Sequence, residues 1–115
     1  MRARSPAKSA ALDAVLSALA DPHRRKVVDV LRGGPQRAGE LSRLVGLSAP
    51  AMSRHLRQLK SCGLVAETHP EYDSRVRIYA LKPAPLGELK SWLEQTERLW
   101  ADQLASFKKH LERGE

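Results

Sequence analysis

The spacing of apolar residues changes twice along this chain, and these changes limit the folds that it can adopt. As far as Leu59, apolar side chains recur every three or four residues, which indicates amphipathic helices. Between Arg75 and Leu81 they alternate with polar ones, as in a half-exposed strand. From Leu86 to Leu111 the helical spacing returns. The sequence therefore predicts a mainly α protein with one small β-hairpin.

Turn-forming residues divide the first part of the chain into four expected helices. Asp21 followed by Pro22 is a helix start, because the carboxylate accepts hydrogen bonds from the first backbone N–H groups and proline has none to lose. Ser48 caps a later helix in the same way, with Pro50 in its first turn. In chain order, the helices cover residues 10–20, the stretch from Pro22 to the Gly33-Gly34-Pro35 stop, Gly39–Val45, and the stretch from Ser48 to Gly63.

The hairpin and a long closing helix complete the expected order, α-α-α-α-β-β-α. The strands are residues 64–68 and 75–81, and HPEYDS between them is typical of a turn. Pro83 and Pro85 are expected to break the chain before a helix over residues 86–112. Alternation places on one strand face Val76, Ile78 and Ala80, and on the other Arg75, Arg77 and Tyr79.

The size and composition of the chain exclude several classes of protein. Its 115 residues suffice for one domain, which we place at residues 9–115, after a disordered basic arm at residues 1–8. Apolar stretches are too short for a membrane span, and no signal core follows the arm. A single cysteine, Cys62, excludes an intrachain disulfide, which fits a cytoplasmic protein. The sequence has no glycine-rich phosphate loop, nucleophile elbow or carboxylate pair in an apolar context, so neither an enzyme nor a cofactor site is expected.

Positive charge is concentrated where acidic residues are absent. The net charge is +7, and the first 85 residues carry fifteen basic groups against seven acidic ones. No carboxylate occurs from Leu41 to Ala66. The cations of that stretch are Arg43, Arg54, Arg57 and Lys60. Such a surface lowers the cost of approaching closely spaced phosphates, so nucleic acid is the favoured partner.

Two short helices that meet at Gly46 form a predicted helix-turn-helix within this stretch. Its inward residues are Leu41, Leu44, Met52, Leu56 and Leu59. The outer face of its second helix then carries Ala49, Pro50, Ser53, Arg54 and Arg57. Small side chains at the helix start permit close approach to base edges in the major groove, and the arginines can reach guanine or phosphate. The alternative, a merely solvated face, predicts mixed charges like those of the closing helix. We therefore expect these five outer residues to bind double-stranded DNA.

The hairpin is expected to extend the same surface. Arg75 and Arg77, on one strand face, are expected to grip flanking phosphates or the minor groove. Charge that protects an exposed edge strand explains Arg77 almost as well. Glu71 and Asp73 oppose contact between the very tip and the DNA backbone. His55 lies next to core leucines and is expected to be packed or partly buried rather than to read a base.

Three stretches resemble the ArsR/SmtB family of bacterial winged-helix repressors, namely LADPHRRKVVDVL, AGELSRLVGLSAPAMSRHLRQLKSCGLV and RVRIYAL. The most diagnostic piece is Ser-Arg-His-Leu at 53–56, followed by Gly-Leu-Val at 63–65. PAPLGELKSWLEQTERLW resembles the closing helix of a metal-free branch of that family. The resemblance implies a winged-helix homodimer that represses transcription, often of its own operon. It also implies DNA contacts at Ala49, Pro50, Ser53, Arg54 and Arg57, and the wing arginines carry over less directly.

The sequence departs from the metal-sensing members of that family. They carry Cys-x-Cys in the third helix, where this chain has Glu-Leu-Ser-Arg-Leu at 40–44, or Asp/His pairs in the last helix, where it offers only His110. The histidines, at 23, 55, 69 and 110, show no His-x-x-His or His-x-x-x-His spacing, and Cys62 has no partner cysteine. Because a metal normally needs three or four convergent ligands, we predict no metal site and no dithiol switch. Cys62, near the end of a core helix, is expected to be buried and inert.

The closing helix carries more apolar surface than one small domain needs. At 1.5 Å per residue it would be about 40 Å long, and its apolar stripe would be exposed in a monomer. The stripe is Leu86, Leu89, Leu93, Thr96, Trp100, Leu104, Phe107 and Leu111, widened by Trp92 and Leu99. With the first helix, it predicts a homodimer interface at Leu12, Leu16, Leu89, Trp92, Leu93, Thr96, Trp100 and Leu104. The alternative is a helix that folds back on its own core.

A twofold dimer presents two recognition helices to successive major grooves, so an inverted-repeat operator is expected. The predicted function is sequence-specific binding of double-stranded DNA, with repression preferred to activation. The protein would then lie at the nucleoid when bound. Two alternatives stay open. A winged-helix module that binds proteins instead of DNA would tolerate loss of Arg54 and Arg57, and a small-molecule effector near Trp92 and Trp100 is compatible with all of these features.

Overall fold

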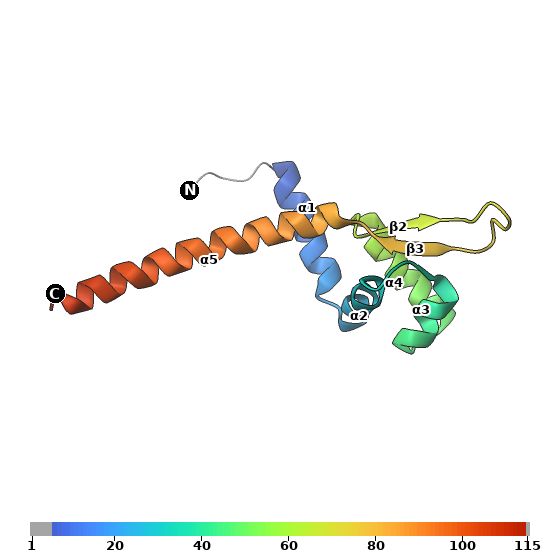
Figure 1. Cartoon of the computed structure of the whole chain (residues 1–115), viewed down its shortest axis with the longest axis horizontal. Coiled ribbons are helices and arrows are strands. Elements are labelled where there is room, and N and C mark those ends of the chain that lie inside the picture. The colour runs from blue at the N-terminus through green and yellow to red at the C-terminus, as the bar shows by residue number, and fades with distance from the viewer. Residues whose placement is uncertain (1–5, 115) are drawn as a thin grey trace.

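The computed structural model describes residues 6–114 and confirms a mainly α protein with a small antiparallel sheet (Figure 1). Four helices and the sheet form a body from which the last helix extends, so the molecule measures 71 × 29 × 21 Å. In chain order the elements are α1 (Pro6–Leu19), α2 (Pro22–Leu31), β1 (Gln36–Arg37), α3 (Ala38–Val45), α4 (Ala49–Ser61), β2 (Val65–Thr68), β3 (Ile78–Leu81) and α5 (Pro83–Glu112).

Local sequence signals set several helix ends as predicted. The Asp21 carboxylate accepts hydrogen bonds from two backbone N–H groups in the first turn of α2, at 2.8 and 3.1 Å. At the start of α4, the Ser48 hydroxyl accepts a hydrogen bond from the Ala51 N–H at 3.3 Å. Gly46 ends α3 with a φ of 80°, a left-handed conformation that glycine adopts without a steric cost.

Two helices begin earlier than the sequence predicted. Helix α1 begins at Pro6 rather than Ala10, and the rest of the predicted arm, residues 1–5, lies outside the described residues. Helix α5 already includes Pro83 and Pro85 in its first turn, so these prolines begin the helix instead of breaking the chain before it. The reason is that N–H groups of the first turn have no acceptor within the helix, and a proline there loses no hydrogen bond.

One apolar core lies between α1–α4 and the sheet. Its most completely buried large side chains are Leu41, Met52, Leu56, Leu59 and Leu64. Leu44 was predicted to face inward and does not: it is 42% exposed, and Val45 is 6% exposed. In α3, the buried residue that follows Leu41 is therefore Val45, four residues later, and not Leu44, three residues later. Tyr79 is 2% exposed, so its face of β3 points to the core.

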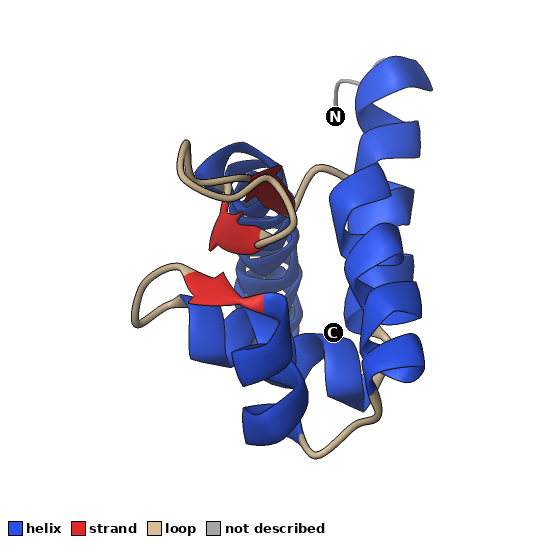
Figure 2. Ribbon diagram, turned by 90° about the vertical axis from the view of Figure 1, so that its right-hand side faces the viewer, coloured by secondary structure: helices blue, strands red, loops and turns tan. Residues whose placement is uncertain are grey.

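The sheet has a third strand that the sequence did not predict. Its order is β1-β3-β2, with antiparallel neighbours throughout. In β1, Gln36 pairs with Tyr79 and Arg37 pairs with Ile78. Two polar residues are too few to show the alternation by which a strand is recognised. Figure 2 shows the short strands beside the helical body. Strand β1 pairs with β3 and is followed directly by α3 in the chain.

The hairpin, called the wing below, comprises β2, β3 and the connection between them, residues 65–81. Strand β3 begins at Ile78, so residues 75–77 belong to the connection and not to the strand as predicted. Asp73 explains the difference. Its carboxylate accepts a hydrogen bond from the Arg75 N–H at 2.9 Å, and its carbonyl accepts one from the Val76 N–H at 3.3 Å. The turn therefore continues past the expected strand start.

Helix α5 is far longer than its contact with the body. Its 30 residues span about 45 Å at 1.5 Å per residue. It packs against α1 near its start, and none of its residues is buried. Its early leucines, Leu86 and Leu89, are partly buried against the core. Among the described residues, no helix is both long and apolar enough to cross a membrane.

Candidate nucleic-acid interface

Helices α3 and α4 form the predicted helix-turn-helix. Leu41 and Val45 of α3 and Met52 and Leu56 of α4 are buried between them and the rest of the core. In the corner at Gly46, the backbone N–H groups of residues 46 and 47 both donate to the Ser42 carbonyl, at 2.9 and 3.0 Å. The inner face of α4 is thus fixed, and this determines which side chains point outward.

The five residues predicted on the outer face of α4 are all accessible. Ala49, Pro50, Arg54 and Arg57 are exposed, and Ser53 is partly buried. The guanidinium groups of Arg54 and Arg57 form no hydrogen bond or ion pair with any residue from 6 to 114. Two cations without carboxylate partners therefore stand on one exposed helix face that begins with small side chains.

The carboxylates that flank the acid-free stretch are both engaged. Glu40 forms an ion pair with Arg43, which lowers the pKa of Glu40 and raises that of Arg43. Arg43 thus differs from the other cations of the stretch, because its charge is already opposed. At the other end, Glu67 lies 3.9 Å from the Lys60 ammonium. Within the acid-free stretch, Arg54 and Arg57 are therefore the cations whose charge no carboxylate of the described residues opposes.

Glu67 also connects the wing to helix α4, a role that the sequence did not reveal. The Tyr79 hydroxyl donates to Glu67 Oε1 at 2.6 Å, and His69 Nε2 lies 3.2 Å from Oε2. The hydrogen bond from Tyr79 is the main cause that lowers the pKa of Glu67. Burial is the largest cause that raises the pKa of Tyr79 to about 12, and the hydrogen bond to Glu67 is the next. With Lys60 on α4, this network fixes the base of the wing against the helix.

The wing arginines are placed differently from each other. Arg75 is paired with Asp73, Nε to Oδ1 at 3.2 Å, and its side chain is 89% exposed. Arg77 turns toward α4 and donates from Nη2 to the Ser53 hydroxyl at 3.5 Å, the long limit of a hydrogen bond. Both arginines therefore lie before β3 in the chain. They do not form a pair on one strand face, which is the arrangement that the sequence predicted. Arg77 is the one that adjoins the outer face of α4.

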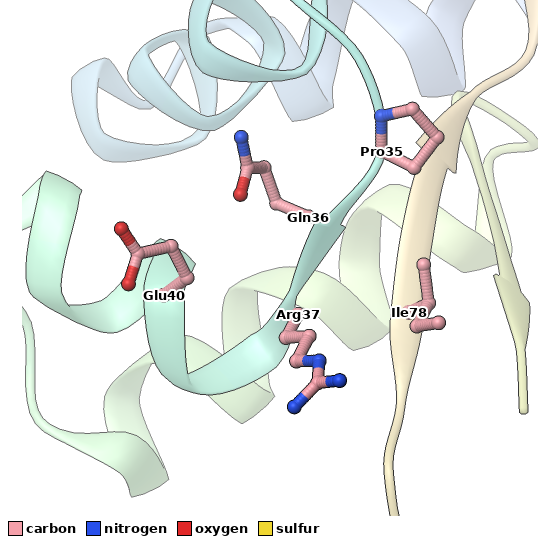
Figure 3. A pocket seen from close by; sticks show the side chains of 5 residues that line it. All are labelled: Pro35, Gln36, Arg37, Glu40 and Ile78. Atoms are coloured by element: carbon pink, nitrogen blue, oxygen red, sulfur yellow. The ribbon is translucent and has the colours of Figure 1, made fainter. Parts of the chain in front are cut away.

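A further cation of this region, Arg37, was not found from the sequence because it lies outside the acid-free stretch. It donates from Nη2 to the Tyr72 hydroxyl of the wing at 2.9 Å. It lines a pocket of about 460 Å³ with Pro35, Gln36, Glu40 and Ile78, in which its guanidinium points away from Glu40 (Figure 3). An adjoining hollow of about 390 Å³ is lined by Arg37, Arg75 and Arg77 together with the start of α3. No sequence signal marks Arg37, because its place beside the wing follows from the pairing of β1 with β3.

A second exposed surface lies on α5 and α1. Of the residues predicted at a dimer interface, Leu16, Leu93, Trp100 and Leu104 are between 39% and 63% exposed. Thr96 is exposed as well, and Leu89 and Trp92 are partly buried. Leu12 is 5% exposed, so it is already buried within the single chain. Leu99, Phe107 and Leu111 add further exposed apolar surface along α5.

The structure brings two groups that are close in the sequence together with a third from another helix. Asp21 and His23 at the start of α2 meet His55 of α4, and one possible ligand atom from each lies within 4.8 Å of the others. His55 is partly buried, as predicted, and so is Cys62, which was expected to be buried. The sequence prediction of no metal rested on spacing along the chain, which does not detect ligands from two helices.

A helix-turn-helix with a cationic outer face and a hairpin wing beside it is the arrangement of a winged-helix DNA-binding protein. The family described as "Bacterial regulatory protein, arsR family" matches residues 21–67. The HTH-type transcriptional regulator Rv2034 of Mycobacterium tuberculosis is 37% identical over 95 residues, which cover 83% of each chain. The chain belongs to the ArsR family of bacterial transcriptional regulators.

Other relatives agree with this assignment. The transcriptional repressor SdpR of Bacillus subtilis is 30% identical over 79 residues, covering 69% of this chain and 84% of SdpR. An ArsR-like transcriptional regulator from Rhodococcus sp. RHA1 has a similar solved structure, with a TM-score of 0.79, 28% identity, and coverage of 95% of this chain and 97% of that one. The protein is therefore a DNA-binding transcriptional regulator with a winged-helix fold.

Proposed function

We propose that this regulator is a homodimeric repressor in which each copy inserts α4 into the major groove of one half of an inverted repeat. The observation that carries the proposal is the outer face of α4, where Arg54 and Arg57 have no partner among residues 6–114. An arginine without a carboxylate partner keeps its full charge for a phosphate or for the acceptor atoms of guanine.

The order of residues on α4 suits entry into the groove. Ala49 and Pro50 begin the helix and are exposed, so its N-terminal end can approach base edges closely. Ser53 follows one turn later, where its hydroxyl, which accepts the long contact from Arg77, can still donate its own proton to a base. The hollow between the start of α3 and the wing is lined by Arg37, Arg75 and Arg77 and also by Glu40, whose charge Arg43 opposes. Its three arginines suit a flanking phosphate.

Dimerisation through α5 and α1 is supported by apolar surface that one chain leaves uncovered. Leu93, Trp100, Leu104, Phe107 and Leu111 are each 47% exposed or more, on a helix that leaves the body. A continuous apolar stripe of this kind marks an association surface. A second copy carries the same stripe, so a twofold axis can cover both at once and direct both α4 helices to one side of the duplex.

Repression follows from where such a dimer would bind. A dimer that occupies two successive major grooves near a promoter excludes polymerase from the same DNA. The relative SdpR is a transcriptional repressor, which supports repression over activation for this chain as well.

Selection of genomic DNA fragments with purified protein tests the proposal. We expect an inverted repeat to be enriched, and we expect the double variant Arg54→Ala/Arg57→Ala to enrich nothing above background. Arg98→Ala, which removes an exposed arginine of α5 instead, is the matched control and should select the same repeat as the natural sequence. Enrichment of no palindrome by the natural sequence, or an unchanged selection by the double variant, would refute the proposed reading mode.

A further inference from the structure

The start of α2 and the middle of α4 bring three metal-ligating side chains together behind the DNA-reading face. Asp21 precedes α2, His23 lies in its first turn, and His55 comes from α4. One possible ligand atom from each lies within 4.8 Å of the other two. The imidazole ring centres of His23 and His55 are 5.7 Å apart. Neither the recognition of DNA nor the proposed dimer uses this cluster.

We propose that Asp21, His23 and His55 form a binding site for a divalent transition metal ion, with Zn²⁺ as the best-suited probe. Two imidazoles and one carboxylate are a ligand set that zinc takes in proteins, and they leave a fourth position for water. Bonds of 2.0–2.1 Å in a tetrahedron place ligand atoms about 3.3 Å apart. The present spacing is within 4.8 Å, so the side chains need only a small inward movement.

The side chain that must move most freely is also the most accessible one. His23 is 48% exposed on its side chain, and its Nδ1 lies 3.8 Å from Asp21 Oδ1. Rotation of this ring toward the carboxylate and toward His55 therefore disturbs no packed core. His55 is partly buried and belongs to a helix whose neighbouring leucines are fixed, so it supplies the rigid half of the site.

The carboxylate retains an oxygen for the metal while it caps the helix. The N–H groups of His23 and Arg24 both donate to Asp21 Oδ1, at 2.8 and 3.1 Å. Asp21 Oδ2 accepts no hydrogen bond from the part of the chain that the structure describes. A cation at Oδ2 thus leaves the cap intact, and the negative charge of Asp21 offsets the partial positive charge at the start of α2.

Arg24 is the competitor for this site. Its Nη1 lies 3.3 Å from His55 Nδ1, and because a guanidinium only donates, Nδ1 is the acceptor and Nε2 carries the proton. Metal binding at either ring nitrogen requires this contact to be given up. Arg24 keeps its remaining bonds when that happens, from Nε to the Ala18 carbonyl at 2.7 Å and from Nη2 to the Ser17 carbonyl at 3.3 Å. At 3.3 Å, the contact between Arg24 Nη1 and His55 Nδ1 is long for a hydrogen bond, so it is the weaker of the two interactions that compete for the imidazole.

The test is calorimetric titration of the full chain with ZnCl₂ after treatment with a chelator, together with thermal unfolding. We expect one Zn²⁺ per chain. The apparent Tm should rise by roughly 10 °C at a hundredfold excess of free zinc over Kd. His23→Ala should weaken zinc binding tenfold or more and should reduce the Tm shift by at least about half. Because His23 is exposed, this variant should keep the Tm of the metal-free natural sequence.

The other two histidines provide the matched control. His69 belongs to the wing and His110 to the end of α5, and the double variant His69→Ala/His110→Ala should bind one Zn²⁺ with unchanged affinity. Equal zinc affinity of the natural sequence and His23→Ala overturns the proposal. Absence of saturable binding to the natural sequence overturns it too, as does loss of the site in the double variant. Operator selection without added metal does not depend on zinc binding. Failure of the zinc proposal would therefore leave the proposed function untouched.

Discussion

At the scale of single residues, the arginines of the proposed DNA surface differ in what already surrounds them. Arg43 is held by Glu40 and Arg75 by Asp73, whereas Arg57 has no partner in the described part of the chain. A paired arginine must release its carboxylate before it can neutralise a phosphate, and so it gains less from DNA. Residues that look equivalent in the sequence are therefore expected to contribute unequally to DNA binding.

Substitution of Arg57 by alanine should weaken binding to the operator about tenfold or more, which corresponds to about 1.4 kcal/mol. The matched substitution Arg43→Ala lies in the same helix-turn-helix but removes a charge that Glu40 already opposes, so the loss should stay below about threefold. Fluorescence anisotropy over a series of salt concentrations measures both. Equal losses for the two variants would contradict the role assigned to the unpaired arginines.

Tyr79 and Glu67 give a prediction about pH. Because the hydrogen bond from Tyr79 lowers the pKa of Glu67, the stability from this pair is present above the ordinary pKa of a glutamate. It is lost as the pH falls through the lowered pKa. Tyr79→Phe should therefore reduce the free energy of unfolding by about 1 kcal/mol at pH 7. That difference should shrink toward pH 3.

Urea unfolding of the natural sequence and of Tyr79→Phe at several pH values measures this difference. Tyr72→Phe is the control, because Tyr72 is 74% exposed and, within residues 6–114, its hydroxyl only accepts from Arg37. A gap between natural sequence and Tyr79→Phe that is independent of pH would show that the pair does not carry the stability assigned to it.

At the scale of elements, the corner between α3 and α4 depends on the conformation of one residue. Gly46 has a φ of 80°, and an added Cβ there would meet nothing within 4 Å, so only the backbone conformation opposes a side chain. Gly46→Ala should cost about 1–2 kcal/mol of stability. Gly39→Ala adds the same methyl group in α3, also with nothing within 4 Å and without a left-handed φ. It should be neutral or stabilising in a denaturant titration, and an equal cost for both would be inconsistent with this explanation.

The apolar stripe of α5 predicts the behaviour of charged variants. If the proposed dimer forms through α5, Trp100→Glu and Leu104→Glu should convert it to a monomer without loss of helix content, because both side chains are exposed in the single chain. Gln95→Glu introduces the same charge elsewhere on α5, at an exposed polar position, and should leave the dimer intact. Sedimentation velocity gives the mass of each variant. A natural sequence that is monomeric at micromolar concentration would remove the basis for the dimer.

The order of helices followed from the sequence because each signal is local. Asp21, Ser48 and Gly46 act on backbone groups within a few residues, and the leucines of α4 repeat at helical spacing. Strand β1 could not be predicted, since its pairing with β3 joins segments about forty residues apart and two polar residues show no alternation. The start of β3 at Ile78 was missed because the Asp73 turn competes with the strand for residues 75–77.

The site was predictable to the same extent and for the same reason. The outer face of α4 follows from its inner leucines, so the five predicted residues are accessible in the structure. The interaction partners of the side chains in this region do not follow from the pattern of leucines. The pairing of Arg75 with Asp73, the turn of Arg77 toward Ser53, and the meeting of His23 with His55 all depend on tertiary contacts. Those contacts decide which of several similar side chains is available to a ligand.

At the scale of the whole molecule, the shape of the chain relates its two surfaces. The helix-turn-helix and the wing lie at one end of a molecule 71 Å long, and the apolar stripe of α5 extends toward the other. The proposed association through α5 would therefore leave both α4 helices uncovered. In a twofold dimer, the separation between those helices is fixed by the protein, so the DNA must supply half-sites at a matching distance.

The affinity of the protein for its selected operator, measured as the spacing between half-sites is varied, tests this account most directly. We predict the tightest binding when the half-site centres lie about one helical turn apart, roughly 10 base pairs. Insertion of about five base pairs rotates one half-site to the opposite side of the duplex, so it should weaken binding at least tenfold. An affinity that does not change with this insertion would show that the two copies do not read the DNA as one rigid dimer.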